Sequence, residues 1–201
     1  MAKHLDLEEQ EQLDALKHFW DRWGNLITWL LIAVLGAYAA WNGWQYWERR
    51  QGALASVLYD EISRSAAEGD VVRVERALAD LKDKYGGTTF AAQGGLLAAK
   101  VLHEKDKSTE AKVALSWVIE KAPDDGLKST ARLRLASLLV ADKAYDEAIK
   151  LLSGSFPESF GPLAADRRGD VLLLQGKRVE ASTEYGKAYQ GLTAEAGDYR
   201  K

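Results

Sequence analysis

The sequence contains no cysteine, only three prolines and only three histidines. Without cysteine the chain forms no disulfide bond, thiolate metal site or cysteine nucleophile, and the redox state of its compartment stays open. The histidines, His4, His18 and His103, never stand at a spacing such as H-x-x-x-H, which favours surface or packing roles over metal ligation. The scarcity of proline permits helices along the whole chain.

Motifs that carry chemistry are also missing. No G-x-x-x-x-G-K-[ST] phosphate loop occurs, and no Ser/His/Asp set stands out from chance. Gly86-Gly87 predicts a turn, Gly94-Gly95 a close contact between helices, and Asp124-Asp125 a cap for the helix that follows. We therefore expect no enzyme activity, no metal and no cofactor.

Clusters of basic residues are absent as well. The chain has 27 Lys and Arg against 30 Asp and Glu, and its net charge is −3. Phosphate backbones are bound by clustered Lys and Arg, so a nucleic-acid partner is not expected. The negative charge is concentrated in residues 1–24, which hold three basic and six acidic side chains.

One long segment without charge dominates the N-terminal part of the chain. Residues 23–47 contain no charged side chain, and the helical rise from Trp23 to Trp44 is about 31 Å, enough to cross a hydrocarbon core of roughly 30 Å. Six of the seven tryptophans lie between positions 20 and 47, five of them near the two ends of the segment, where aromatic rings prefer the headgroup level. The pattern predicts a single transmembrane helix.

Two alternatives remain for this segment. A buried core helix is one, although such a helix rarely runs this far without a charge. A cleaved signal peptide is the other, because Ala37-Tyr38-Ala39 has the form of a cleavage site. The acidic region before the segment and the aromatic residues after it argue against cleavage.

Charge alone does not orient the segment. Lys17 and Arg22 precede it, whereas Arg49, Arg50 and Arg64 follow it, which is close to a tie under the positive-inside rule.

Residues 1–22 form a tail with an amphipathic pattern. Leu13, Leu16, Trp20 and Trp23 recur at helical spacing and share one face. Such a segment lies along the membrane interface, binds a partner helix, or is a solvated helical extension.

Residues 48–201 predict a soluble domain of helical repeats. Glycine, proline and aspartate breakers fall at intervals of about one helix, which indicates about eight helices in antiparallel pairs. Small or β-branched residues recur in the second helix of each pair at separations of 37, 37 and 33: Val74, Ala111, Ala148 and Ala181. The fold class that follows is all-α, with one N-terminal transmembrane helix and a tetratricopeptide-like α-solenoid of about four hairpins. An irregular helical bundle is the alternative.

Stacked hairpins present a surface lined by the first helix of each pair, and this surface is the candidate partner-binding groove. Arg134 and Arg167 take the same offset in consecutive repeats. The alternative is that both are ordinary solvated residues. The residues expected to line the groove are Leu133, Arg134, Ser137, Asp166, Arg167 and Asp170.

Five motifs occur in an order that resembles a known family. They are F-W-D-R-W-G-N before the apolar segment, G-W-Q-Y-W-E after it, then Y-G-G-T-T-F-A-A, L-K-S-T-A-R-L-R-L-A and A-D-R-R-G-D-V-L-L-L-Q-G-K. Together they resemble the YfgM family of ancillary subunits of the SecYEG translocon. The departures are a shorter C-terminus after Leu192 and a segment unusually rich in tryptophan.

The resemblance implies an inner-membrane protein with a cytoplasmic N-terminal tail and a periplasmic repeat domain. It also implies association with SecYEG, with a membrane-anchored periplasmic chaperone of the PpiD type, and with emerging secreted chains. The alternative function is a structural tether or scaffold in envelope assembly or cell division.

Overall fold

The computed structural model describes residues 7–198, and within this range every regular element is helical. The chain divides after Arg50 into two compact units, so each unit is described by itself. The all-α prediction is confirmed. The elements are α1 Leu7–Glu68, α2 Val71–Tyr85, α3 Thr89–Glu104, α4 Ser108–Lys121, α5 Asp125–Ala141, α6 Tyr145–Leu152, the 3₁₀ turn η1 Glu158–Phe160, α7 Gly161–Leu174 and α8 Arg178–Asp198.

The first unit consists of the helical part of α1 up to Arg50. Its apolar side chains point outward; Trp29 and Leu30, for example, are more than half exposed. Among the described residues, α1 contains the one segment long and apolar enough to cross a membrane, and almost none of that segment is buried. This exposure within the first unit favours the membrane span over the buried core helix.

Polar side chains within this apolar segment turn back to their own helix. The Thr28 hydroxyl donates to the Gly24 carbonyl at 2.7 Å, and the Asn42 amide donates to the Tyr38 carbonyl at 2.8 Å. Such bonds spare polar groups from facing hydrocarbon without a partner. Both residues are therefore compatible with a membrane span.

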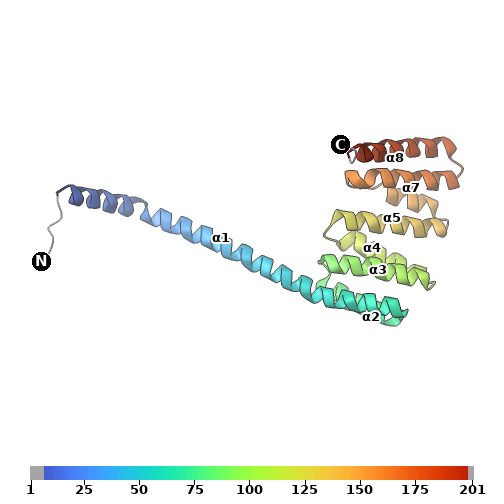
Figure 1. Ribbon diagram of the computed structural model, residues 1–201, viewed down its shortest axis with the longest axis horizontal. Helices are drawn as coiled ribbons and strands as arrows, with labels where there is room; N and C mark the ends of the chain where they lie inside the picture. The colour runs from blue at the N-terminus through green and yellow to red at the C-terminus, as the bar shows by residue number, and fades with distance from the viewer. Residues whose placement is uncertain (1–6, 199–201) are drawn as a thin grey trace. The chain divides into compact units, whose positions relative to one another are not determined.

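The second unit begins at Gln51 and contains four helical hairpins stacked in chain order (Figure 1). In the first hairpin, Ile62 at the end of α1 belongs to the same buried core cluster as Val74 and Leu81 of α2. In the other three hairpins α3 contacts α4, α5 contacts α6, and α7 contacts α8, while α2 also contacts α3, α4 contacts α5, and α6 contacts α7. The prediction of about four hairpins is confirmed.

The turn inside each hairpin has one repeated backbone conformation. In every case a residue with positive φ follows the first helix, and the next N–H bonds to a carbonyl five residues back, as in a Schellman motif. In the third hairpin, Ala144 donates to Leu139 at 2.8 Å in this way. The positive-φ residues are Gly69, Asp106, Lys143 and Gly176.

The small residues of the second helices lie at the centre of the packing. Val74, Ala111, Ala148 and Ala181 are each at most 1% exposed. Small side chains at these positions let the two helices of a hairpin approach closely. The repeat interpretation is therefore supported by packing as well as by spacing.

Glycines in α3 permit still closer approach. A Cβ on Gly94 would lie 2.6 Å from Leu81 Cδ2, and one on Gly95 would lie 2.5 Å from Val118 Cγ2. No real Cβ tolerates such contacts without movement of a neighbour. The expected close helix contact at Gly94-Gly95 is confirmed, and Asp124 caps α5 as predicted by accepting the Leu127 N–H at 2.9 Å.

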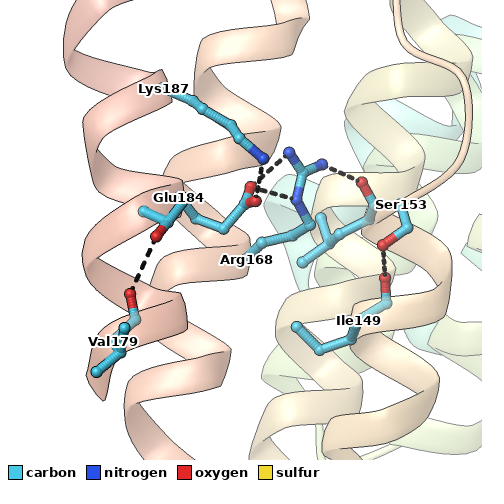
Figure 2. Close-up of polar contacts among 8 residues, drawn as sticks. Ile149, Ser153, Arg168, Val179, Glu184 and Lys187 are labelled. Atoms are coloured by element: carbon cyan, nitrogen blue, oxygen red, sulfur yellow. Dashed lines mark hydrogen bonds and ion pairs between the residues drawn. The ribbon is translucent and has the colours of Figure 1, made fainter. Parts of the chain in front are cut away.

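An ion-pair network links the third and fourth hairpins (Figure 2). Arg168 on α7 pairs with Glu184 on α8 at 2.7 Å and also donates to the Leu152 carbonyl at the end of α6 at 2.7 Å. Lys187 contacts the other Glu184 oxygen at 2.6 Å. Burial alone raises the pKa of the Glu184 carboxyl, but the hydrogen bonds from Lys187 and Arg168 outweigh burial and hold that pKa below its ordinary value.

Candidate binding surface on the first helices

The candidate surface is formed by α3, α5 and α7, the first helices of three consecutive hairpins. Helix α5 contacts both α3 and α7. Because the hairpin turns share one conformation, residues at equal distances before each positive-φ residue are equivalent. Arg134 and Arg167 are equivalent in this register, as are Ser137 and Asp170. The predicted equivalence of the two arginines thus agrees with the structure of the turns.

A pocket of about 360 Å³ opens between α3 and α5. We call it the α3–α5 pocket. Its floor includes the buried side chains of Ala99, Leu115 and Leu138. Polar and charged side chains surround this apolar floor. The residues that line the pocket are Ala99, Lys100, His103, Leu115, Arg134, Ser137, Leu138 and Ala141.

Two of the six predicted groove residues, Arg134 and Ser137, line this pocket. The Arg134 guanidinium donates to the Leu96 carbonyl of α3 at 3.2 Å, which holds it between the two helices. Within residues 7–198 no carboxylate forms a salt bridge with Arg134, so its charge faces the pocket without an internal counter-ion. The Ser137 hydroxyl donates to the Leu133 carbonyl of its own helix at 3.1 Å.

The three residues predicted on α7 do not line the α3–α5 pocket. Arg167 pairs with Asp170 at 3.2 Å, and the same carboxylate accepts the Tyr185 hydroxyl at 2.9 Å. Burial, followed by this hydrogen bond, raises the pKa of Tyr185. Asp166 lies half-buried on the same helix. The α7 part of the surface therefore satisfies much of its charge internally.

Leu133 lies half-buried and packs against the core cluster of the C-terminal hairpins. That cluster contains Ala136, Ala148, Leu152 and Val171. Much of the Leu133 side chain therefore serves packing between hairpins, and only the remainder is available to a ligand.

Lys100 and His103 complete the α3–α5 pocket, and neither was predicted from the sequence. The signal was present in the repeat register: Lys100 precedes the positive-φ Asp106 by the same distance as Ser137 precedes Lys143. Extending the same register one hairpin earlier identifies Lys100 as a residue of this surface.

Two further hollows lie elsewhere on the repeat unit. One of about 330 Å³, lined by apolar and charged residues, lies between the second helices α2 and α4. The other, of about 320 Å³, lies where α5 meets the loop before η1, and Arg132 there donates to the Ser155 carbonyl and lies over the Phe156 ring. Neither includes a predicted groove residue.

The sequence matches a described family along most of its length. A family profile described as a tetratricopeptide repeat-like domain covers residues 17–201. The crystal structure of MamA has a similar fold, with a TM-score of 0.57 at 17% identity over 71% of this chain and 81% of that one. The structural likeness concerns the fold alone.

Curated relatives extend the match to nearly the whole chain. An ancillary SecYEG translocon subunit of Neisseria gonorrhoeae is 30% identical over 191 residues, which is 94% of this chain and 90% of the relative. The subunits of the same name from Haemophilus influenzae and Escherichia coli are 26% and 28% identical, over 92% and 88% of this chain and 90% and 85% of the relatives. The family resemblance inferred from the five motifs is thereby confirmed, and the chain belongs to the YfgM family of ancillary SecYEG translocon subunits, built on tetratricopeptide-like repeats.

Proposed function

We propose that this chain is an accessory subunit of the SecYEG translocon in the bacterial inner membrane. The observation that carries the proposal is the match, over about nine-tenths of both chains, to relatives named for that role. The match includes the apolar segment as well as the repeats, because the family profile begins at residue 17. Because the relatives match both the apolar segment and the repeats, the chain is proposed to act at the same membrane complex as they do.

In this proposal residues 23–47 form a single membrane span. Residues 1–22 form a cytoplasmic amphipathic tail, and residues 48–201 form a periplasmic repeat domain. The exposed apolar side chains of α1 and its internally bonded Thr28 and Asn42 support the span. The orientation follows the family resemblance, since the flanking charges do not decide it.

The repeat domain acts by binding, without catalysis. The first-helix surface holds a membrane-anchored periplasmic chaperone of the PpiD type, or an emerging secreted chain, beside the translocon. The α3–α5 pocket supports this role because it combines an apolar floor with the unneutralised Arg134.

Site-specific photocrosslinking in intact cells tests the function. A photoreactive residue at Arg134 or at Arg167 should form adducts with SecYEG or with a periplasmic chaperone. Adducts only with cell-division or outer-membrane components would instead establish the tether or scaffold. A photoreactive residue at Arg76, exposed on α2, serves as the matched position outside the first-helix surface.

The absence of cysteine gives a direct test of orientation. Lys17→Cys and Ser137→Cys each provide one thiol, at positions exposed in their own units. A membrane-impermeant maleimide added to cells with a permeable outer membrane should label Ser137→Cys but not Lys17→Cys. The reverse pattern would refute the proposed topology. Sequencing the N-terminus of the mature protein tests the anchor, because a chain that begins near Ala40 has lost the span.

A further inference from the structure

The α3–α5 pocket is lined by two cationic side chains, Arg134 and Lys100. Arg134 has no carboxylate partner within the described residues, whereas Arg167 is paired with Asp170 on the same helix. Lys100 contacts Glu104 at 3.8 Å, but both side chains are more than half exposed, so water and salt weaken the pair. The pocket therefore presents two cations that a ligand can neutralise.

The Arg134 guanidinium is held in place by a hydrogen bond that leaves its other N–H donors available to a ligand. One of its N–H groups donates to the Leu96 carbonyl, and a guanidinium carries five such donors in a planar fork. A carboxylate is the group that this fork recognises best, because two parallel hydrogen bonds form at once. The contact with Leu96 reduces the ordering cost when such a ligand arrives.

The floor of the pocket is complementary to an apolar group next to that carboxylate. Ala99, Leu115 and Leu138 are each at most 8% exposed, and their aliphatic atoms form the base. A volume of about 360 Å³ is at the lower end of the range of ligand pockets. The pocket is thus large enough for an aliphatic side chain beside a carboxylate.

We propose that the α3–α5 pocket binds an acidic segment of a protein partner, in which a Glu or Asp lies beside an aliphatic residue. The carboxylate of the segment contacts Arg134 and Lys100. His103 and Ser137 lie at the rim of the pocket, and the aliphatic side chain of the segment lies on the floor. This inference rests on the proposed function, because it specifies what the first-helix surface recognises.

The experiment measures peptide binding to the full chain in neutral-lipid nanodiscs by fluorescence anisotropy. The probe is a short labelled peptide of Ser-Leu-Glu repeats with both ends blocked, and the comparison peptide has Gln in place of Glu. We expect the Glu peptide to bind and the Gln peptide to bind about tenfold more weakly, because two partly exposed charge contacts are lost.

Variants assign the binding to the pocket. Arg134→Gln combined with Lys100→Gln should weaken binding of the Glu peptide about three- to tenfold, whereas Arg134→Lys should lose less because it keeps the charge. The matched control is Arg76→Gln with Lys121→Gln, two exposed cations on second helices, which should bind like the unmodified chain. All substituted side chains are exposed, and circular dichroism checks that the helices are retained.

Several results would overturn the proposal. Equal binding of the Glu and Gln peptides would show that the carboxylate is not recognised. Unchanged binding to the Arg134/Lys100 double variant would show that the pocket is not the binding site. Binding only by a peptide with a free C-terminus would identify a terminal carboxylate as the ligand. Arg134-dependent binding to phosphatidylglycerol vesicles, without peptide binding, would identify a lipid headgroup instead. A photoreactive residue at Arg167 in the same double variant tests the proposed function separately. Adducts with SecYEG together with lost peptide binding would support the function and leave only the peptide assignment to be judged.

Discussion

Replacing Arg168 with methionine tests how the third and fourth hairpins are held together. The Arg168 and Glu184 side chains are 21% and 14% exposed, and Arg168 also donates to the Leu152 carbonyl of the neighbouring hairpin. Methionine keeps an apolar stem of similar length, so packing changes little while the charge and its hydrogen bonds are lost.

The magnitude follows from burial. Removing one partner of a buried pair costs about 3–5 kcal/mol, but Lys187 still contacts Glu184 and both side chains keep some access to water. We therefore expect the free energy of unfolding to fall by about 2–3 kcal/mol. The measurement is urea unfolding of the full chain in detergent, followed by far-ultraviolet circular dichroism. Because repeat domains unfold in parts, the affected transition should be the one that includes α7 and α8.

The neighbouring arginine supplies the control. Arg167 and Asp170 are 51% and 44% exposed, and such a pair contributes at most about 1 kcal/mol. Arg167→Met should therefore cost much less than Arg168→Met. A similar loss for the two variants, or a loss below about 0.5 kcal/mol for Arg168→Met, would refute the importance of the buried network.

Three further predictions concern the repeat unit. Lys143→Gly should raise the free energy of unfolding by about 0.5–1 kcal/mol, because Lys143 has φ 60° and glycine adopts that conformation without a Cβ clash; urea unfolding measures it, and a destabilised variant would contradict it. Gly169→Ala should cost about 1–3 kcal/mol, because the new Cβ would lie 2.6 Å from Tyr185 Cε1 and that ring is tied to Asp170; an unchanged melting temperature would show that the ring moves freely. The Glu184 carboxyl has a pKa below its ordinary value, so the stability it contributes is present at neutral pH and is lost as the pH falls below about 4.5 toward the folded-state value. Glu184→Gln should therefore lose less stability than the unmodified chain when the free energy of unfolding is measured at decreasing pH. The same loss of stability in the variant and the unmodified chain would contradict this prediction.

The repeat architecture could be predicted because its packing requirements recur in the sequence. Small residues at fixed separations, such as Ala111 and Ala148, mark places where helix axes approach, and these residues are buried as expected. The hairpin turns were only partly predictable. Gly69 and Gly176 suit a positive φ, but Lys143 has no such preference, and its conformation is imposed by the Schellman turn that the packed helices require.

Contacts between hairpins could not be predicted from the sequence. The bond from Arg168 to the Leu152 carbonyl depends on where α6 ends, and nothing in the arginine itself indicates that neighbour. The candidate surface depends on such contacts as well. Sequence offsets placed Arg134 and Ser137 on it, but the pairing of Arg167 with Asp170 and the contribution of Lys100 depend on the three-dimensional neighbourhood.

The amphipathic tail presents its apolar residues on the outside of a helix. Within the described residues, Leu13, Leu16 and Trp20 lie on α1 and are more than half exposed. Helix formation there agrees with the periodic pattern, whereas His4 and the first acidic residue, Asp6, lie outside the described residues. An interfacial helix, a partner-binding helix and a solvated extension remain distinct hypotheses for the tail, and wild-type behaviour after deletion of residues 1–20 would exclude a partner role.

Affinity purification from membranes solubilised in a mild detergent tests the central claim most directly. The full chain carries the affinity tag, and an unrelated single-pass membrane protein with the same tag is the control. We expect SecYEG subunits to co-purify with the full chain and to be depleted from the control. Recovery of SecYEG no greater than in the control, with cell-division or outer-membrane proteins recovered instead, would contradict it.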